Sequence, residues 1–271
     1  MKSRLLVAAV GIPLLLVILF ACHPIVTALA ISLLSAIGAR EFTKTTGINT
    51  NEGMLFVTMA AAFLLPIWSY FGSPILIGAI GVVILGLVLF TQALLAYPQV
   101  KFEGVAGCLF AALAIPMCLS SIVRILVGEF GRHYVLVPIM IPFIADAGAY
   151  FAGKFLGKHK MAPVLSPHKT IEGAIGGLAA GVLSMVIYGL VMQFGLHFTF
   201  HYGYAVLYGL LGSIVSIIGD LSFSMVKRET GIKDYGTIFR AHGGVLDRFD
   251  SVIFAAPVVE LLILLLPLLG K

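Results

Sequence analysis

Nine apolar runs, each near the length that crosses a bilayer as a helix, constrain this 271-residue chain more than any other feature. Backbone groups in hydrocarbon must satisfy their own hydrogen bonds, and none of the runs alternates like a barrel strand. We therefore predict an all-α polytopic membrane protein with about nine transmembrane helices. The runs cover approximately Leu5–Cys22, Pro24–Ala39, Gly53–Phe71, Pro74–Tyr97, Gly104–Val127, Tyr134–Gly153, Ile171–Phe194, His201–Gly219 and Val252–Leu269.

The composition agrees with a membrane protein and argues against a nucleic-acid partner. Hydrophobic residues make up 60% of the chain and charged residues 11%, whereas soluble domains carry about 25% charged residues. The net charge of +5 comes from cations beside apolar segments and not from a long Lys/Arg run. The three cysteines lack CxxC spacing, which favours buried small hydrophobes over a zinc site or disulfides.

The loop charges predict the orientation of the chain. With a cytoplasmic N-terminus, fourteen Lys and Arg residues lie on the inner side and three on the outer side, as the positive-inside rule requires. The polar loops 154–170 and 220–251 then face the cytoplasm. We predict a multi-pass protein of the inner (cytoplasmic) membrane, with an active site that faces the cytoplasm. Residues 1–141 would form a scaffold or lipid cavity, and residues 142–271 would carry the chemistry.

The stretch 219–251 holds five cations and five acids between two apolar runs. Carboxylates can hold a divalent metal, and cations can hold phosphates. If the preceding helix continues, Asp220, Ser224 and either Lys227 or Arg228 share one face. This arrangement suits a metal-bound phosphate. A helix cap or an internal ion pair is the alternative for Asp220.

The end of that stretch adds further acids. Asp247 and Asp250 are three residues apart, so they share a helix face. Together with Asp220 they are candidates to ligate one or two Mg²⁺ ions, which prefer oxygen ligands and often bridge substrate phosphates. In the alternative, Asp250 orients Arg248 or Lys233.

Three residues just before Asp247 are candidates for ligand contact. Gly243 and Gly244 allow a tight loop against a ligand, because glycine permits close backbone approach. His242 either donates a hydrogen bond to phosphate or makes a structural hydrogen bond. The sequence alone does not separate these two roles.

A second segment, 146–177, also carries polar residues in an apolar setting. A carboxylate such as Asp146 costs about 2.5–3.5 kcal/mol at a helix centre and usually faces a polar cavity. A buried acid that is paired or neutral is the alternative. The sequence SPHKTIEG predicts a helix N-terminus, capped by Ser166 or Thr170, where Lys169 would bind phosphate. A juxtamembrane snorkelling lysine is the alternative.

The polar positions of residues 224–250 resemble the signature of the phosphatidate cytidylyltransferases, also called CDP-diacylglycerol synthases. The segments DAGAYFAGKFLGKHK and SPHKTIEGAIGG are similar to that family too, so the resemblance covers about residues 142–252. The chain departs from the family pattern at His168, Ile171, Arg240 and Ala241. The matching positions are Ser224, Lys227, Arg228, Lys233, Asp234, Gly236, His242, Gly243, Gly244, Asp247, Arg248 and Asp250.

The resemblance implies the conversion of CTP and phosphatidate into CDP-diacylglycerol and pyrophosphate. It implies Mg²⁺ as cofactor, as one or two divalent ions, and leaves room for a monovalent ion. Metal ligands would be Asp220 and Asp247, with Asp250 and Asp146 as outer or second-metal candidates. The implied catalytic and substrate-binding residues, besides these acids, are Ser166, Lys169, Ser224, Lys227, Arg228, Lys233, His242, Gly243, Gly244 and Arg248.

Two rival functions remain open from the sequence. A CTP-dependent kinase of a polyprenol-type lipid would release CDP and no pyrophosphate. An ion transporter would line its pathway with Asp146, Asp220 and Glu260, but most charges gather at one interface. The expected partners are CTP, phosphatidate and membrane lipids, with no nucleic acid, and a homodimer is left open.

Overall fold

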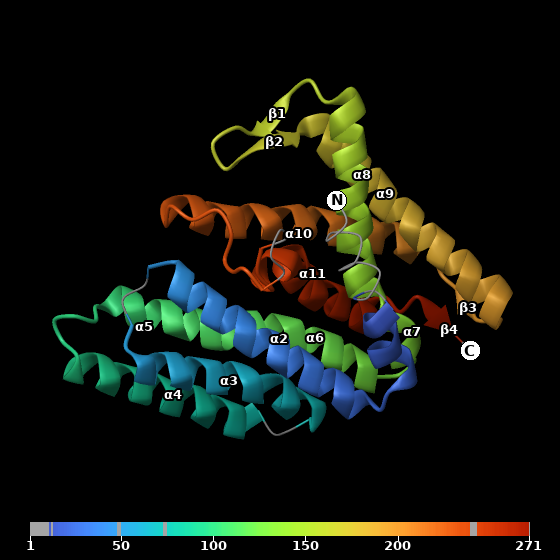
Figure 1. The fold of residues 1–271 in the computed structure, drawn as a ribbon. Coiled ribbons are helices and arrows are strands. Elements are labelled where there is room, and N and C mark those ends of the chain that lie inside the picture. The colour runs from blue at the N-terminus through green and yellow to red at the C-terminus, as the bar shows by residue number, and fades with distance from the viewer. Residues whose placement is uncertain (1–10, 12, 48–49, 73–74, 239–242, 271) are drawn as a thin grey trace. The chain divides into compact units, whose positions relative to one another are not determined.

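The computed structural model describes residues 11, 13–47, 50–72, 75–238 and 243–270. Within these residues the chain is mainly helical, and seven helical stretches are long and apolar enough to cross a membrane (Figure 1). The predicted all-α polytopic class is confirmed. The seven stretches are Pro24–Thr45, Glu52–Tyr70, Ile75–Leu95, Phe102–Val127, Gly131–Leu156, Ile171–Gly195 and Tyr202–Glu229.

These seven stretches correspond to the second to eighth predicted apolar runs. Residues 5–10 and 12 of the first run lie outside the described residues, residues 13–16 are helical, and the short π-helix η1 (Val17–Ala21) follows them. The ninth run belongs to helix α11 (Leu246–Leu265). That helix begins before the apolar run and carries Asp247, Arg248 and Asp250 in its first turns, and it is not among the seven stretches.

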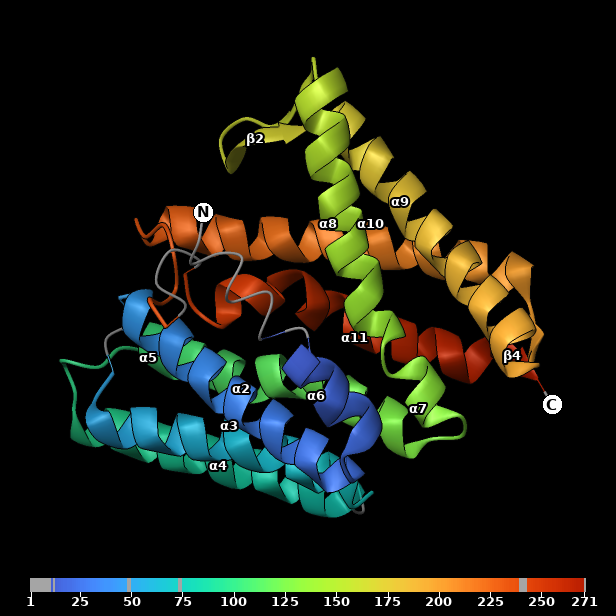
Figure 2. The ribbon, with the colours of Figure 1, turned by 45° about the vertical axis from the view of Figure 1, so that its right-hand side comes forward.

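The chain folds into two compact units, Met1–Val127 with Glu229–Phe249, and Gly128–Arg228 with Asp250–Lys271. In the first unit, α2 packs against α3 and α6, and α3 also contacts α4 (Figures 1 and 2). The predicted division of roles at residue 141 stays a prediction. The elements of this unit before its late segment are α2 (Pro24–Thr45), α3 (Glu52–Tyr70), α4 (Ile75–Leu95), α5 (Phe102–Leu109), η2 (Phe110–Ala114) and α6 (Ile115–Val127).

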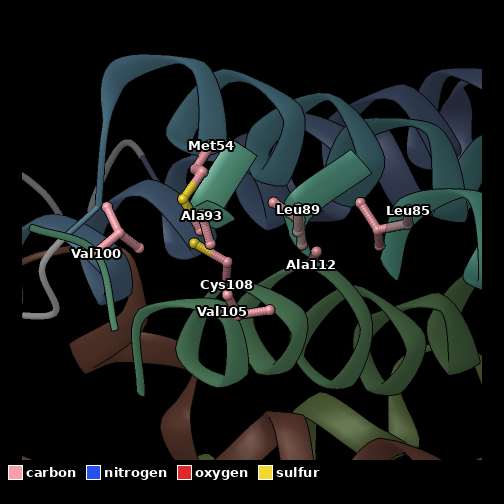
Figure 3. Packing of buried hydrophobic residues seen from close by; sticks show 8 residues of the cluster. All are labelled: Met54, Leu85, Leu89, Ala93, Val100, Val105, Cys108 and Ala112. Atoms are coloured by element: carbon pink, nitrogen blue, oxygen red, sulfur yellow. The ribbon is translucent and has the colours of Figure 1, made fainter. Parts of the chain in front are cut away.

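Helix α4 joins the first unit through one narrow stripe. Leu85, Leu89 and Ala93 recur every four residues and are buried, whereas Ile75 and Leu76 are among many exposed apolar side chains of the same helix. A helix that is apolar on both faces suits contact with protein on one side and lipid on the other. Figure 3 shows the stripe within a cluster of Met54, Leu85, Leu89, Ala93, Val100, Val105, Cys108 and Ala112.

In the second unit, α8 and α9 pack closely along their length because small residues line the contact. A Cβ atom on Gly148 would clash with Ala180, and one on Gly176 would clash with Ala152. The remaining elements of this unit include the part of α11 from Asp250 onward. The others are α7 (Gly131–Tyr134), α8 (Val137–Leu156), β1 (Lys160–Ala162), β2 (Ser166–Thr170), α9 (Ile171–Leu190), η3 (Val191–Gly195), β3 (Thr199–Phe200), α10 (Tyr202–Glu229) and β4 (Leu269–Gly270).

A short antiparallel hairpin, β1–β2, joins α8 to α9 (Figures 1 and 2). The helix N-terminus predicted within SPHKTIEG is confirmed at Thr170 and not at Ser166, because Ser166 pairs with Ala162 in the hairpin. Helix α9 begins only after Thr170, whose hydroxyl oxygen accepts a hydrogen bond from the Gly173 N–H at 3.1 Å. Of the two predicted caps, Thr170 is confirmed and Ser166 is wrong.

Candidate active site

The second unit contains a cavity of about 450 Å³ that brings three predicted site residues together. Asp146 comes from α8, Lys169 from β2 and Asp220 from α10. Asp146 thus lines a cavity, and its predicted role in the site stays a prediction. The other lining residues are Ala149, Tyr150, Gly153, Lys154, Met161, His168, Thr170, Gly173, Ala174 and Ile217.

Lys169 and Asp220 form an ion pair at this cavity, with the Lys169 ammonium on Oδ2 of Asp220. The two side chains are 25% and 23% exposed, so the pair is partly shielded from solvent. Ser224 donates from Oγ to Oδ1 of Asp220 at 3.4 Å, since α10 continues to Glu229 as the shared-face prediction required. The structure thus shows the ion pair that the sequence left open for Asp220, and its metal role stays a prediction.

Two further acids are linked through Ser251 on α11. Its Oγ lies 3.3 Å from Oδ2 of Asp146 and 3.4 Å from Oδ1 of Asp250. The Ser251 N–H also donates to Oδ1 of Asp250 at 2.7 Å. Ser251 therefore connects a carboxylate of α8 to one of α11, a role that sequence reasoning missed.

Asp250 is 7% exposed and lies in the first turns of α11, before the predicted apolar run. Burial raises the pKa of its carboxyl to about 7, and the negative charges of Asp220 and Asp146 act in the same direction. The Lys227 ammonium and the Ser251 N–H oppose this rise in pKa. Asp220 and Asp146 therefore lie close enough to Asp250 for their charges to act on its carboxyl.

The donor atoms that these three acids supply are of the type that suits a magnesium ion. All are carboxylate oxygens, the ligand type that Mg²⁺ prefers. Among the residues that the structure describes, no group of three or more His, Cys, Asp or Glu side chains forms a ready-made metal shell. Mg²⁺ usually takes one or two carboxylates and completes its coordination with waters and substrate phosphates, so a full protein shell is not required.

The hairpin that carries Lys169 is held at two points. The Arg228 Nε–H donates to the Leu165 carbonyl oxygen at 3.1 Å, which ties the hairpin turn to α10. Glu172 accepts hydrogen bonds from the Lys158 and His159 N–H groups and contacts His159 Nδ1 at 2.6 Å. These contacts fix the hairpin relative to α9 and α10 and thereby position Lys169 at the cavity.

The remaining predicted residues belong to the first unit. Asp247 is 8% exposed, and its Oδ2 accepts hydrogen bonds from the Tyr235 N–H at 2.7 Å and the Gly244 N–H at 3.0 Å. Asp247 therefore folds the chain before α11 onto the start of that helix. Lys233 and Arg248 are exposed. His242, like the departures at Arg240 and Ala241, lies outside the described residues.

Glu41, on α2, is a residue that sequence reasoning missed. It is 4% exposed, and its Oε1 and Oε2 accept hydrogen bonds from the Val245 and Leu246 N–H groups at 3.1 and 2.9 Å. These amides lie at the start of α11, where a helix has no partners of its own. An acid at the end of an apolar run is the signal that singled out Asp220, and it would also have found Glu41, which follows the run Pro24–Ala39.

The fold and the cavity define a class: a polytopic helical membrane protein in which two acids and a lysine line one cavity. The sequence profile of the Cytidylyltransferase family matches residues 2–266, and the chain belongs to this family.

Relatives of this chain include bacterial proteins named phosphatidate cytidylyltransferase. The protein from Staphylococcus aureus (strain COL) is 34% identical over 163 residues, which cover 57% of this chain and 61% of that protein. The protein from Staphylococcus haemolyticus (strain JCSC1435) is 32% identical over 163 residues, which again cover 57% of this chain and 61% of that protein. The similarity thus spans less than two thirds of these relatives' length.

Proposed function

We propose that this chain is an integral membrane phosphatidate cytidylyltransferase. A phosphate oxygen of phosphatidate attacks the α-phosphorus of CTP, the bond to the β-phosphate oxygen breaks, and pyrophosphate leaves. CDP-diacylglycerol remains in the membrane. The observation that carries this proposal is the cavity of a cytidylyltransferase-family protein in which Lys169, Asp146 and Asp220 meet.

The protein groups act by positioning and charge neutralisation, because this displacement needs no covalent enzyme intermediate. Lys169 is held at the cavity by Asp220 and faces the space where phosphates would enter. Its ammonium, with that of Lys227, neutralises phosphate charge as it grows in the transition state. The roles that the resemblance implies for Lys233, Asp247 and Arg248 are part of the same proposal.

Asp220 and Asp247 would hold a magnesium ion, as the resemblance implies, with Asp250 and Asp146 as outer or second-metal candidates. When bound, this ion would neutralise charge on the triphosphate and the leaving group. Ser251 keeps Asp146 and Asp250 linked, so the two carboxylates are presented together. The proposal includes an active site that faces the cytoplasm from the inner membrane, as the loop charges predict.

The test is transfer of cytidine-labelled CTP into organic-extractable lipid by the purified protein, with and without phosphatidate. The parent protein should label lipid only when phosphatidate and Mg²⁺ are both present. Asp220→Asn should abolish most of the labelling, and Lys160→Ala, at an exposed position of β1, should retain it. Lipid labelling that does not depend on phosphatidate, or no labelling by folded parent protein, would refute the proposal.

A further inference from the structure

Two glycines of the family-like segment lie against the carboxylate of Glu41. A Cβ atom on Gly236 or on Gly244 would overlap Glu41 side-chain atoms. For Gly244, the three nearest atoms to such a Cβ are Oε1, Oε2 and Cδ of Glu41. Gly244 does not have a positive φ, so its backbone would accept alanine. The space taken by Glu41 is what excludes a side chain there.

Gly243 differs from Gly244 in this respect. Its φ is +77°, and a Cβ there would lie 2.7 Å from Oδ2 of Asp247. Glycine is thus required at 243 by the backbone conformation itself. A substitution at 243 would not report on Glu41, whereas a substitution at 244 would.

The end of α2 holds this segment by a second contact as well. Phe42, the neighbour of Glu41, stacks on Tyr235, with ring centroids 6.1 Å apart and planes at 22°. The Tyr235 N–H donates to Asp247. Phe42 therefore contacts Tyr235, whose N–H donates to Asp247. Glu41 holds Val245 and Leu246, the two residues that directly precede Asp247.

We infer that Glu41 is a positioning residue: it fixes the start of α11 and thereby the place of Asp247, and it imposes the glycine at 244. As far as activity is concerned, this inference rests on the proposed function. Glu41 touches no substrate in this account. It acts through the backbone N–H groups of Val245 and Leu246, which donate hydrogen bonds to its carboxylate. These two residues directly precede Asp247.

A double-mutant cycle in thermal stability tests the contact without reference to activity. Gly244→Ala and Glu41→Ala should each lower the unfolding midpoint of the purified protein. The double variant should be no less stable than Glu41→Ala alone, because the new methyl group enters the space that Glu41 leaves. Glu103→Ala, at an exposed acid of the same unit, is the control and should not relieve Gly244→Ala. Additive losses in the double variant would overturn the inference.

The positioning role is tested by Glu41→Gln, which keeps the size of the side chain but places an amide N–H₂ group against one of the two backbone donors. We expect an about 10-fold loss in kcat/KM for CTP, the equivalent of ~1.4 kcal/mol. We also expect a several-fold rise in the Mg²⁺ concentration needed for half-maximal activity, because Asp247 is displaced. A merely structural residue would not move the Mg²⁺ dependence. Unchanged kinetics in folded Glu41→Gln would overturn the positioning role.

These two tests separate the inference from the proposed function. If the parent protein transfers no cytidylyl group, the proposed function fails, and the stability cycle still decides whether Glu41 imposes glycine at 244. If the parent protein is active and the cycle is additive, the proposed function stands and the inference about Glu41 fails.

Discussion

The Lys169–Asp220 ion pair allows the contribution of these residues to folding to be measured apart from their contribution to chemistry. Lys169→Ala removes the ammonium and leaves the Asp220 carboxylate at a cavity that also holds Asp146. The negative charge of Asp220 already raises the pKa of Asp250, so an unpaired Asp220 adds to repulsion among the acids. Adding Asp220→Asn to Lys169→Ala removes the charge that was left behind.

The magnitude follows from the exposure of the pair. Removing one partner of a fully buried pair costs about 3–5 kcal/mol, and an exposed pair contributes about 0–1 kcal/mol. The side chains are 25% and 23% exposed, so after discounting for solvent we expect a cost of ~2 kcal/mol for Lys169→Ala. For a chain of this size that corresponds to a drop of about 4–8 °C in the unfolding midpoint. The double variant should recover at least about half of this drop.

Turnover should behave differently from stability. Lys169→Ala and Asp220→Asn should each lower turnover about 100-fold. Lys169→Ala removes positive charge that stabilises the transition state, and Asp220→Asn weakens the proposed hold on Mg²⁺. The double variant should recover stability but no activity. The assays are the unfolding midpoint in detergent and the initial rate of lipid labelling, with Lys160→Ala as the control. A double variant whose stability losses add, or a Lys169→Ala variant with near-parent turnover, would refute this reasoning.

Three further predictions concern acids, packing and topology. Without metal and near neutral pH, Asp250→Asn should keep or raise the unfolding midpoint, because it relieves charge repulsion among the acids. It should lower turnover at least ~10-fold, because it removes a proposed metal ligand. A variant that is less stable and equally active would contradict this prediction. Gly148→Ala should lower the midpoint, because its methyl group would clash across the α8–α9 contact. Gly81→Ala, at an open position of α4, should leave the unfolding midpoint unchanged. Equal drops in the midpoint for the two variants would contradict the proposed packing of α8 against α9. Single cysteines at Lys158 and Leu196, in a background without native thiols, should react differently with a membrane-impermeant reagent on intact cells. Labelling only at 196 is expected, and labelling only at 158 would reverse the orientation.

The sequence was sufficient for features that depend on local pattern. Apolar length predicted the seven spanning stretches, because a helix must cover the bilayer thickness. The spacing of Asp220 and Ser224 predicted a shared face, and the hydrogen bond between them confirms that α10 continues. An acid in an apolar run predicted that Asp146 faces a cavity.

The features that the sequence did not give depend on contacts between distant segments. Glu41 and Val245 are 204 residues apart, and no local pattern links a carboxylate to amides at that separation. The strand over SPHKT depends on pairing of Ser166 with Ala162, whereas the capping residues alone suggested a helix start. Ser251 gained its role because α8 and α11 bring Asp146 and Asp250 to the same hydroxyl.

The most direct test of the central claim is the fate of each phosphate of CTP. Purified protein is incubated with phosphatidate, Mg²⁺ and CTP labelled at either the α- or the γ-phosphorus, and the lipid and aqueous products are separated. Cytidylyl transfer predicts α-label in the lipid and γ-label in pyrophosphate. A γ-label in the lipid with release of CDP would contradict the account and identify the protein as a CTP-dependent lipid kinase.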